Sequence, residues 1–106
     1  MRFVQVMRQM MKTREEIIAI LSQKKPEWEK RFQLKSLALF GSFARGDQLE
    51  QSDVDILVEV DPSIGLEFVT LADSIESSLG VPADVVSKRA IKLRYWKEIE
   101  NDLIYV

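Results

Sequence analysis

The stretch from Phe40 to Asp47 reads FGSFARGD, and the stretch from Ser52 to Val60 reads SDVDILVEV. Gly41 and Gly46 have the spacing of the two glycines in a phosphate-binding loop. Such a loop continues with a lysine and a hydroxyl residue, and this chain lacks both at that point. If the glycines hold a phosphate, its negative charge therefore has to be balanced by something other than the usual lysine.

The second stretch predicts a strand with one acidic face and one apolar face. Successive side chains of a strand point to opposite faces, so Asp53 and Asp55 share one face with Leu57. Their Cα atoms would lie ~7 Å apart, from the rise of a strand. Two ionised carboxylates this close repel each other, and a bound Mg²⁺ would relieve the repulsion. A plain polar strand edge is the alternative interpretation. The opposite face is expected to be core and comprises Val54, Ile56, Val58 and Val60.

The glycine turn supplies groups suited to phosphate. Gly41 lets the backbone approach a ligand closely, and Ser42 offers a hydroxyl and an N–H group. Arg45 could add a bidentate contact to phosphate. The alternative is a tight connection with no ligand, in which Arg45 faces water.

A third carboxylate, Asp84, begins another short apolar stretch, ADVVS. We expect it to point to the same site as Asp53 and Asp55, so that the three hold two Mg²⁺ ions. In two-metal catalysis one ion activates the attacking oxygen and the other stabilises the leaving group. Asp84 would then help to activate the attacking hydroxyl, while Gly41 and Ser42 bind the phosphates.

Composition excludes several classes of function. The 106 residues predict one domain, 1–106, in which 1–12 form a disordered or helical N-terminal extension. Without cysteine or histidine there is no thiolate nucleophile, zinc–thiolate site or Ser-His-Asp triad. No apolar run suits a bilayer span, so a cytoplasmic protein is expected. Residues 46–87 hold ten acidic residues and no basic one, which disfavours binding to duplex nucleic acid.

The order of predicted elements favours an α/β fold, a small sheet with helices packed on it. A capping box of Thr13 and Glu16 opens a helix that is expected to end near Gln23. Aromatic side chains in the helices are expected to be core, although stacking on adenine is the other interpretation for Trp28, Phe32, Tyr95 and Trp96. Further elements are predicted as a helix from Pro26 (26–32), strands at 34–40, 53–60 and 83–87, a helix at 65–79 capped by Gly80, and a last helix at 88–102.

The two stretches together resemble the minimal nucleotidyltransferases of the DNA polymerase beta superfamily. Gly41-Ser42, ten residues and then Asp53-x-Asp55 form the motif, and the resemblance covers roughly residues 13–106. It implies a mixed-sheet, polymerase-beta-like nucleotidyltransferase core that uses ATP or another nucleoside triphosphate with Mg²⁺. Asp84 stands where that family places its third carboxylate.

The resemblance also implies a partner. Many small stand-alone members of this family are similar to antitoxins encoded beside a HEPN-type toxin, and some transfer AMP to a tyrosine of that toxin. The expectation is therefore a Mg²⁺-dependent protein adenylyltransferase that uses ATP and acts as an antitoxin. The alternative is a non-catalytic antitoxin that neutralises its partner by forming a complex. Transfer to a small molecule is disfavoured, because no second domain is present to enclose it.

Overall fold

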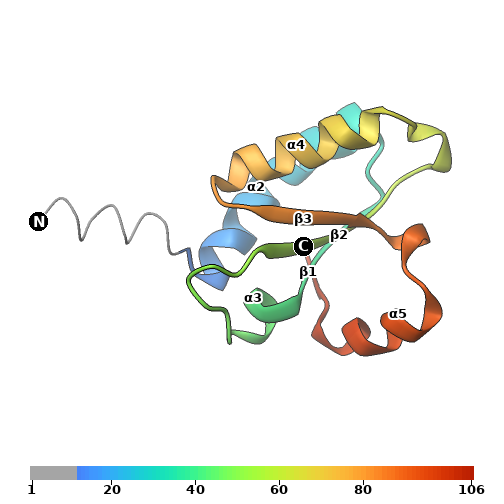
Figure 1. Ribbon diagram of the computed structural model, residues 1–106. Helices are drawn as coiled ribbons and strands as arrows, with labels where there is room; N and C mark the ends of the chain where they lie inside the picture. Colours follow the sequence, from blue (N-terminus) through green and yellow to red (C-terminus); the bar gives the residue numbers. More distant parts are fainter. Residues whose placement is uncertain (1–11) are drawn as a thin grey trace, which may run out of the picture.

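The computed structural model describes residues 12–106, which form a four-stranded mixed sheet with helices on both faces (Figure 1). The strand order is β3-β2-β1-β4. β1 is antiparallel to both β2 and β4, whereas β2 is parallel to β3. This confirms the predicted α/β class with a small mixed sheet. The strands are β1 (Ser36–Phe40), β2 (Val54–Glu59), β3 (Ala83–Ser87) and β4 (Ile104–Tyr105).

The expected N-terminal extension, 1–12, lies outside the described residues except for Lys12. In the part of the chain that is described, no helix is both long and apolar enough to cross a membrane.

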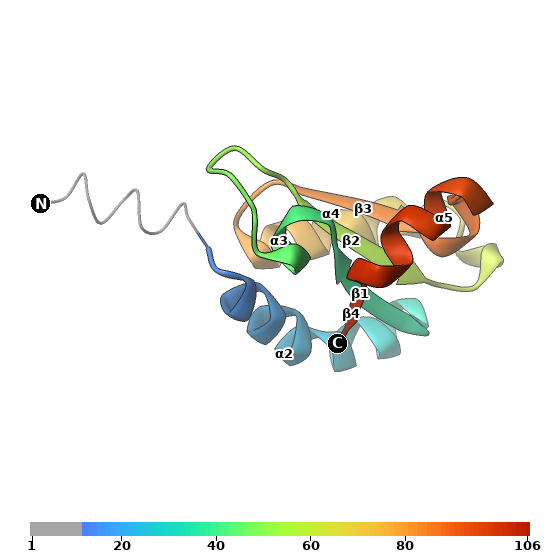
Figure 2. The same cartoon turned by 90° about the horizontal axis from the view of Figure 1, so that it is seen from below.

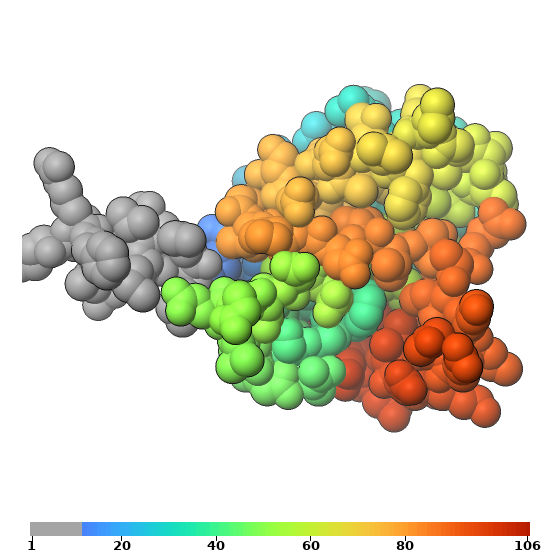
Figure 3. Space-filling model, in the orientation of Figure 1, coloured from blue at the N-terminus to red at the C-terminus, as the bar shows by residue number. Residues whose placement is uncertain are grey.

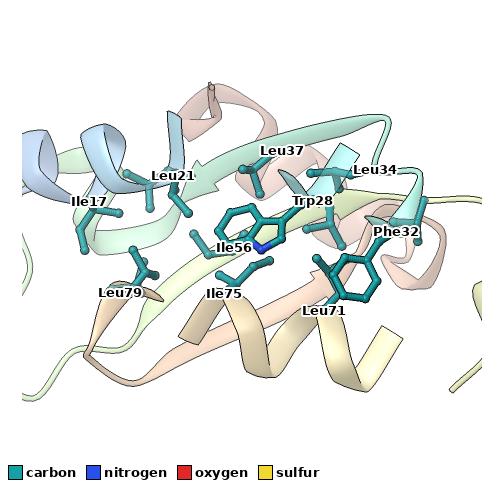
Figure 4. Packing of buried hydrophobic residues seen from close by; sticks show 14 of the residues in the cluster. Ile17, Leu21, Trp28, Phe32, Leu34, Leu37, Ile56, Leu71, Ile75 and Leu79 are labelled. Atoms are coloured by element: carbon teal, nitrogen blue, oxygen red, sulfur yellow. The ribbon is translucent and has the colours of Figure 1, made fainter. Parts of the chain in front are cut away.

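Two long helices, α2 (Arg14–Phe32) and α4 (Glu67–Leu79), cover one face of the sheet (Figures 1 and 2). The main core lies between these helices and the sheet, and Figure 4 shows its side chains interlocking around Trp28. The indole of Trp28 is buried, and its Nε1 donates to Ser74 Oγ on α4 at 3.0 Å, so its one polar atom is satisfied. The aromatic residues Trp28 and Phe32 are thus core, as expected.

The prediction of two separate helices before the first strand is wrong. The capping box is present, since Glu16 N donates to Thr13 Oγ1 at 3.1 Å and Thr13 N donates to Glu16 Oε1 at 3.2 Å. The helix then continues through Pro26 to Phe32 as one element. Proline removes one backbone hydrogen bond and disfavours a helix interior. Here the buried residues before and after it lie on one stripe and pack together against the sheet, which offsets that cost: Ile17, Leu21, Trp28 and Phe32.

The faces of β2 follow the predicted alternation with one addition. The four residues expected to be core, at 54, 56, 58 and 60, are all buried. Leu57, on the face of the aspartates, is also only 2% exposed. That second face is covered by two short helices, α3 (Gly41–Arg45) and α5 (Leu93–Ile99) (Figure 2). The acidic face is therefore partly enclosed.

The C-terminal region differs from the single helix predicted at 88–102. It consists of the 3₁₀ turn η2 (Lys88–Ala90), then α5, then the 3₁₀ turn η3 (Glu100–Asp102). Gly80 caps α4 in the left-handed conformation, as predicted. The segment from η2 to η3 leads from β3, at one edge of the sheet, to β4 at the other, and passes over the acidic face (Figure 1).

Candidate active site

The turn after β1 is fitted to the side chain of Asp55. Phe40, the last residue of β1, pairs in register with Asp55 on β2, which places Gly41 beside that aspartate. Gly41 has φ +74°, a conformation that favours glycine. A Cβ added at Gly41 would collide with Asp55 Oδ2. The glycine is therefore required both by the backbone conformation and by the space that the carboxylate occupies.

Ser42 follows in the first turn of α3 and is half-buried. Its carbonyl oxygen accepts from Gly46 N at 2.9 Å and from Asp47 N at 3.1 Å, and these bonds close the short helix. Gly46 caps α3 in the left-handed conformation, with φ 83°. The second glycine of the motif thus ends the helix that the first one begins.

Asp84 lies directly opposite Asp55, since the two are register partners on the parallel strands β2 and β3. Paired residues of neighbouring strands point to the same face, so Asp84 lies on the face of the sheet that carries Asp55. Asp84 is exposed and Asp55 is half-buried. Burial raises the pKa of Asp55, the nearby charges of Asp84 and Asp53 raise it further, and Arg45 partly opposes them.

Asp53 precedes β2 by one residue and is exposed. The loop before it is closed by two hydrogen bonds, from Leu49 N to Ser52 Oγ at 2.9 Å and from Ser52 N to Leu49 O at 3.0 Å. Asp53 therefore enters the site from the end of the sheet beside α3, while Asp55 and Asp84 lie further along the strands.

The donor set suits a divalent cation that is shared with a ligand. Among residues 12–106, no three acidic side chains gather closely enough to hold a metal ion by themselves. Mg²⁺ is commonly bound by one or two carboxylates together with substrate phosphates and water, and it prefers oxygen ligands. The charges of Asp84 and Asp53 add to the burial that raises the pKa of Asp55, and a bound cation would offset this repulsion. The residues thus fit Mg²⁺ as a partner of a phosphate substrate.

Arg45, expected to contact phosphate, is held by two carboxylates at the edge of the site. Its Nε donates to Asp47 Oδ2 at 3.1 Å and its NH1 donates to Asp102 Oδ2 at 2.9 Å. The guanidinium stays near enough to Asp55 to oppose the rise of its pKa. Asp102 gave no signal in the sequence, because it lies 57 residues from Arg45 and outside any motif.

A pocket of about 350 Å³ adjoins the carboxylates on the side away from α3. Sequence reasoning missed it, because its roof is the segment from η2 to α5. Tyr95, considered for the core or for stacking, is 47% exposed and lines this pocket. In Figure 3 the orange-red atoms of η2 and α5 form a lobe beside the green atoms of α3 and its following loop. The lining residues are Phe40, Asp55, Asp84, Val86, Ala90, Ile91, Lys92, Tyr95 and Ile99.

Residues 15–106 match the family model of the nucleotidyltransferase domain, and the chain belongs to this family. A candidate protein adenylyltransferase of Methanocaldococcus jannaschii, MJ1379, is 46% identical over 101 residues, which are 91% of this chain and 100% of that protein. The protein adenylyltransferase MntA of Thermococcus cleftensis is 40% identical over 98 residues, 91% of this chain and 98% of its own. These relatives confirm that the chain is a nucleotidyltransferase.

Solved structures agree with this assignment. The structure of a candidate minimal nucleotidyltransferase superposes with a TM-score of 0.64 at 30% identity and covers 86% of this chain and 89% of that one. A toxin–antitoxin structure with AMP-PNP superposes with a TM-score of 0.52, also at 30% identity, over 74% of this chain and 60% of that one. The predicted resemblance to minimal nucleotidyltransferases is therefore confirmed.

Proposed function

We propose that this chain transfers AMP from ATP to a tyrosine hydroxyl of a partner toxin of the HEPN type and thereby acts as its antitoxin. The observation that carries the proposal is the pairing of Asp55 and Asp84 across two strands, beside a glycine turn that leaves room for Asp55. The names of the relatives support protein adenylyl transfer, and a related structure is a toxin–antitoxin complex with an ATP analogue.

In the proposed reaction the hydroxyl oxygen of the acceptor attacks the α-phosphorus of ATP. A new phosphorus–oxygen bond forms, the bond to the β-phosphate oxygen breaks, and pyrophosphate leaves with that electron pair. Gly41 and Ser42 would cradle the phosphates, and Arg45 would approach them from the edge of the site. Asp84 would accept the proton of the attacking hydroxyl, because it is the exposed carboxylate of the pair.

Mg²⁺ would be held by Asp53, Asp55 and Asp84 together with the phosphates of ATP. It would neutralise the charge of the phosphates and favour ionisation of the acceptor hydroxyl. The region around the site supplies many carboxylates and few cations, since residues 46–87 contain no lysine or arginine. A triphosphate therefore needs divalent cations to bind there.

The test is intact-mass measurement of the partner toxin after incubation with Mg-ATP and this protein. With the wild-type protein, the mass of the toxin is expected to increase by that of one or more AMP units. Asp55→Asn is expected to lower the rate of this AMP transfer ~100-fold or more. Asp73→Asn is the matched control, because Asp73 is an exposed acid on α4, on the other side of the sheet.

A different outcome would identify the alternative function. If Asp53→Asn and Asp55→Asn together still neutralise the toxin at a stoichiometric ratio, with no added mass, the protein acts by forming a complex. The exposed apolar residues Leu93 and Tyr95 on α5 are the surface that favours this alternative.

A further inference from the structure

The residues of the site follow one another along the direction of the strands. The turn with Gly41 and Ser42 lies at the end where β1 stops, and Asp53 precedes β2 at that same end. The row of Asp55 and Asp84 comes next. The pocket continues from that row toward Val86, which pairs with Leu57 two residues further along the strands from the glycine turn.

The pocket thus adjoins the carboxylates on the side opposite the phosphate-binding turn. Its lining includes Asp55 and Asp84 but none of the residues from Gly41 to Asp53. If the triphosphate occupies the turn, the pocket lies on the far side of the α-phosphorus. An attacking hydroxyl has to approach roughly in line with the leaving oxygen, and therefore from the pocket.

The walls of the pocket suit an aromatic side chain. Phe40 and Val86 form the floor, Ile91, Tyr95 and Ile99 come from the roof, and Ala90 and Lys92 complete the lining. Only the end near Asp55 and Asp84 is acidic. A volume of about 350 Å³ is at the small end of the ~300–1,000 Å³ range of ligand pockets. It accepts one ring more readily than a whole nucleotide.

We propose that this acceptor pocket, defined by the lining residues above, receives the tyrosine side chain of the partner and selects it over serine and threonine. The proposal rests on the proposed function. The phenol ring lies against the apolar walls, and its hydroxyl reaches the Asp55–Asp84 row. The phenolic oxygen bonds to the α-phosphorus as pyrophosphate leaves, and Asp84 takes the phenolic proton.

Two physical features give this selectivity. A serine hydroxyl is one carbon from the partner's backbone, so it can reach the carboxylates only if that backbone enters the narrow pocket. A tyrosine hydroxyl is carried by a ring that fills the pocket and buries apolar area. The phenol, with an ordinary pKa near 10, also loses its proton more readily than an aliphatic hydroxyl. The exposed Leu93, beside the roof, provides apolar surface for the partner around the entering ring.

The first test fills the pocket. Ala90 is exposed and lines the pocket, so Ala90→Trp places a ring there without disturbing the core. AMP transfer to the partner is expected to fall at least ~10-fold through a higher KM for the partner, with Mg-ATP affinity within about twofold of wild type. Ala19→Trp, at an exposed position of α2, is the matched control and should transfer AMP normally. Unchanged transfer by Ala90→Trp would overturn the proposal, and so would a parallel loss of Mg-ATP affinity, which would assign the pocket to the nucleobase.

The second test needs neither ATP nor the partner. N-acetyl-L-tyrosinamide is titrated into the protein while the methyl NMR signals of Ile91 and Ile99 are followed. These signals should shift in wild type and not in Ala90→Trp, whereas N-acetyl-L-serinamide should leave them in place. Absence of a shift with the tyrosine probe would overturn the acceptor pocket. If the probe binds but wild type adds no AMP to any partner protein, the proposed function fails and the pocket assignment stands.

Discussion

Asp55 and Asp84 face each other across the parallel strands β2 and β3, and only Asp55 is half-buried. Two carboxylates in this arrangement repel, and burial adds to the cost of the charge on Asp55. The raised pKa of Asp55 reflects both effects. The free protein thus holds negative charge that Arg45 offsets only in part, and a cation-bound triphosphate would offset the remainder.

Replacing the inner carboxylate should separate stability from activity. Asp55→Asn keeps the shape of the side chain and removes its unfavourable charge. In a buffer with chelator at neutral pH, we expect the melting temperature to rise by a few degrees, while AMP transfer falls ~100-fold or more. Calorimetry and intact-mass kinetics measure the two effects. A lower melting temperature than wild type would show that the charge of Asp55 is compensated in the free protein.

The unfavourable charge of Asp55 should also be visible in the pH dependence of stability. Because the folded pKa of Asp55 is raised, the folded protein binds its proton more tightly than the unfolded chain does. Stability is therefore expected to fall as the pH rises from the ordinary carboxyl pKa through the raised pKa. The free energy of unfolding of wild type minus that of Asp55→Asn, measured with urea in the absence of divalent ions, should fall with pH in this range.

Asp61 contributes a pH dependence of stability that is opposite in sign to that of Asp55. The Ser63 hydroxyl and backbone N–H donate to its carboxylate and lower its pKa. This contribution is present above the ordinary carboxyl pKa and is lost as the pH falls toward the lowered pKa. Comparison with Asp61→Asn therefore identifies the part of the pH dependence that belongs to Asp61, so that it is not attributed to Asp55. A wild-type slope unchanged in Asp55→Asn would contradict the assignment.

Gly41→Ala should harm the site more than a matched glycine substitution elsewhere. Both Gly41 and Gly80 have positive φ, +74° and +70°, so alanine at either is expected to cost ~1 kcal/mol in backbone conformation. Among the described residues, a Cβ added at Gly80 would meet only Lys12 Cε, 4.0 Å away, whereas at Gly41 it would displace the Asp55 carboxylate. We therefore expect Gly41→Ala to unfold more easily than Gly80→Ala and to lose most AMP transfer. Equal activity of the two variants would contradict the close fit of the turn and Asp55.

Arg45 and Asp102 provide a test of phosphate binding at the edge of the site. If Arg45 contacts the triphosphate, Arg45→Ala should weaken Mg-ATP binding several-fold. Asp102→Asn removes one partner of the same guanidinium and should keep or strengthen that binding. The stability change in both is expected to be within about 1 kcal/mol, because Arg45 is exposed and Asp102 is only partly buried. Calorimetric titration with Mg-ATP distinguishes this from a structural role, in which the two variants would have the same ATP affinity.

The sequence predicted the parts of the fold that depend on local pattern. The alternation in β2 was sufficient to place Asp55 on one face and the core valines on the other. The glycine and serine of the turn and the paired aspartates could be proposed because their motif lies within one short segment, residues 41–55. The position of Asp84 depended on which strands pair and in what direction, and the family resemblance supplied what local pattern could not.

Other parts depended on tertiary contacts. Helix α2 continues through Pro26 because residues on both sides share one buried stripe, which a proline rule alone does not consider. The pocket beside Asp55 and Asp84 exists because the segment from η2 to α5 returns over the acidic face, and most of its lining residues lie in that segment. The link between Arg45 and Asp102 likewise joins two segments with no common motif.

The two tryptophans lie in different layers and in different surroundings. Trp28 is sealed in the core with its indole N–H bonded to Ser74, whereas Trp96 on α5 is partly exposed, with Lys88 Nζ 5.4 Å from its ring centre. Their emission should consequently differ in colour and in access to a soluble quencher such as acrylamide. The native chain thus carries one optical reporter of global unfolding and a second on the helix that covers the acidic face of the sheet, and single Trp→Phe replacements allow each to be recorded alone.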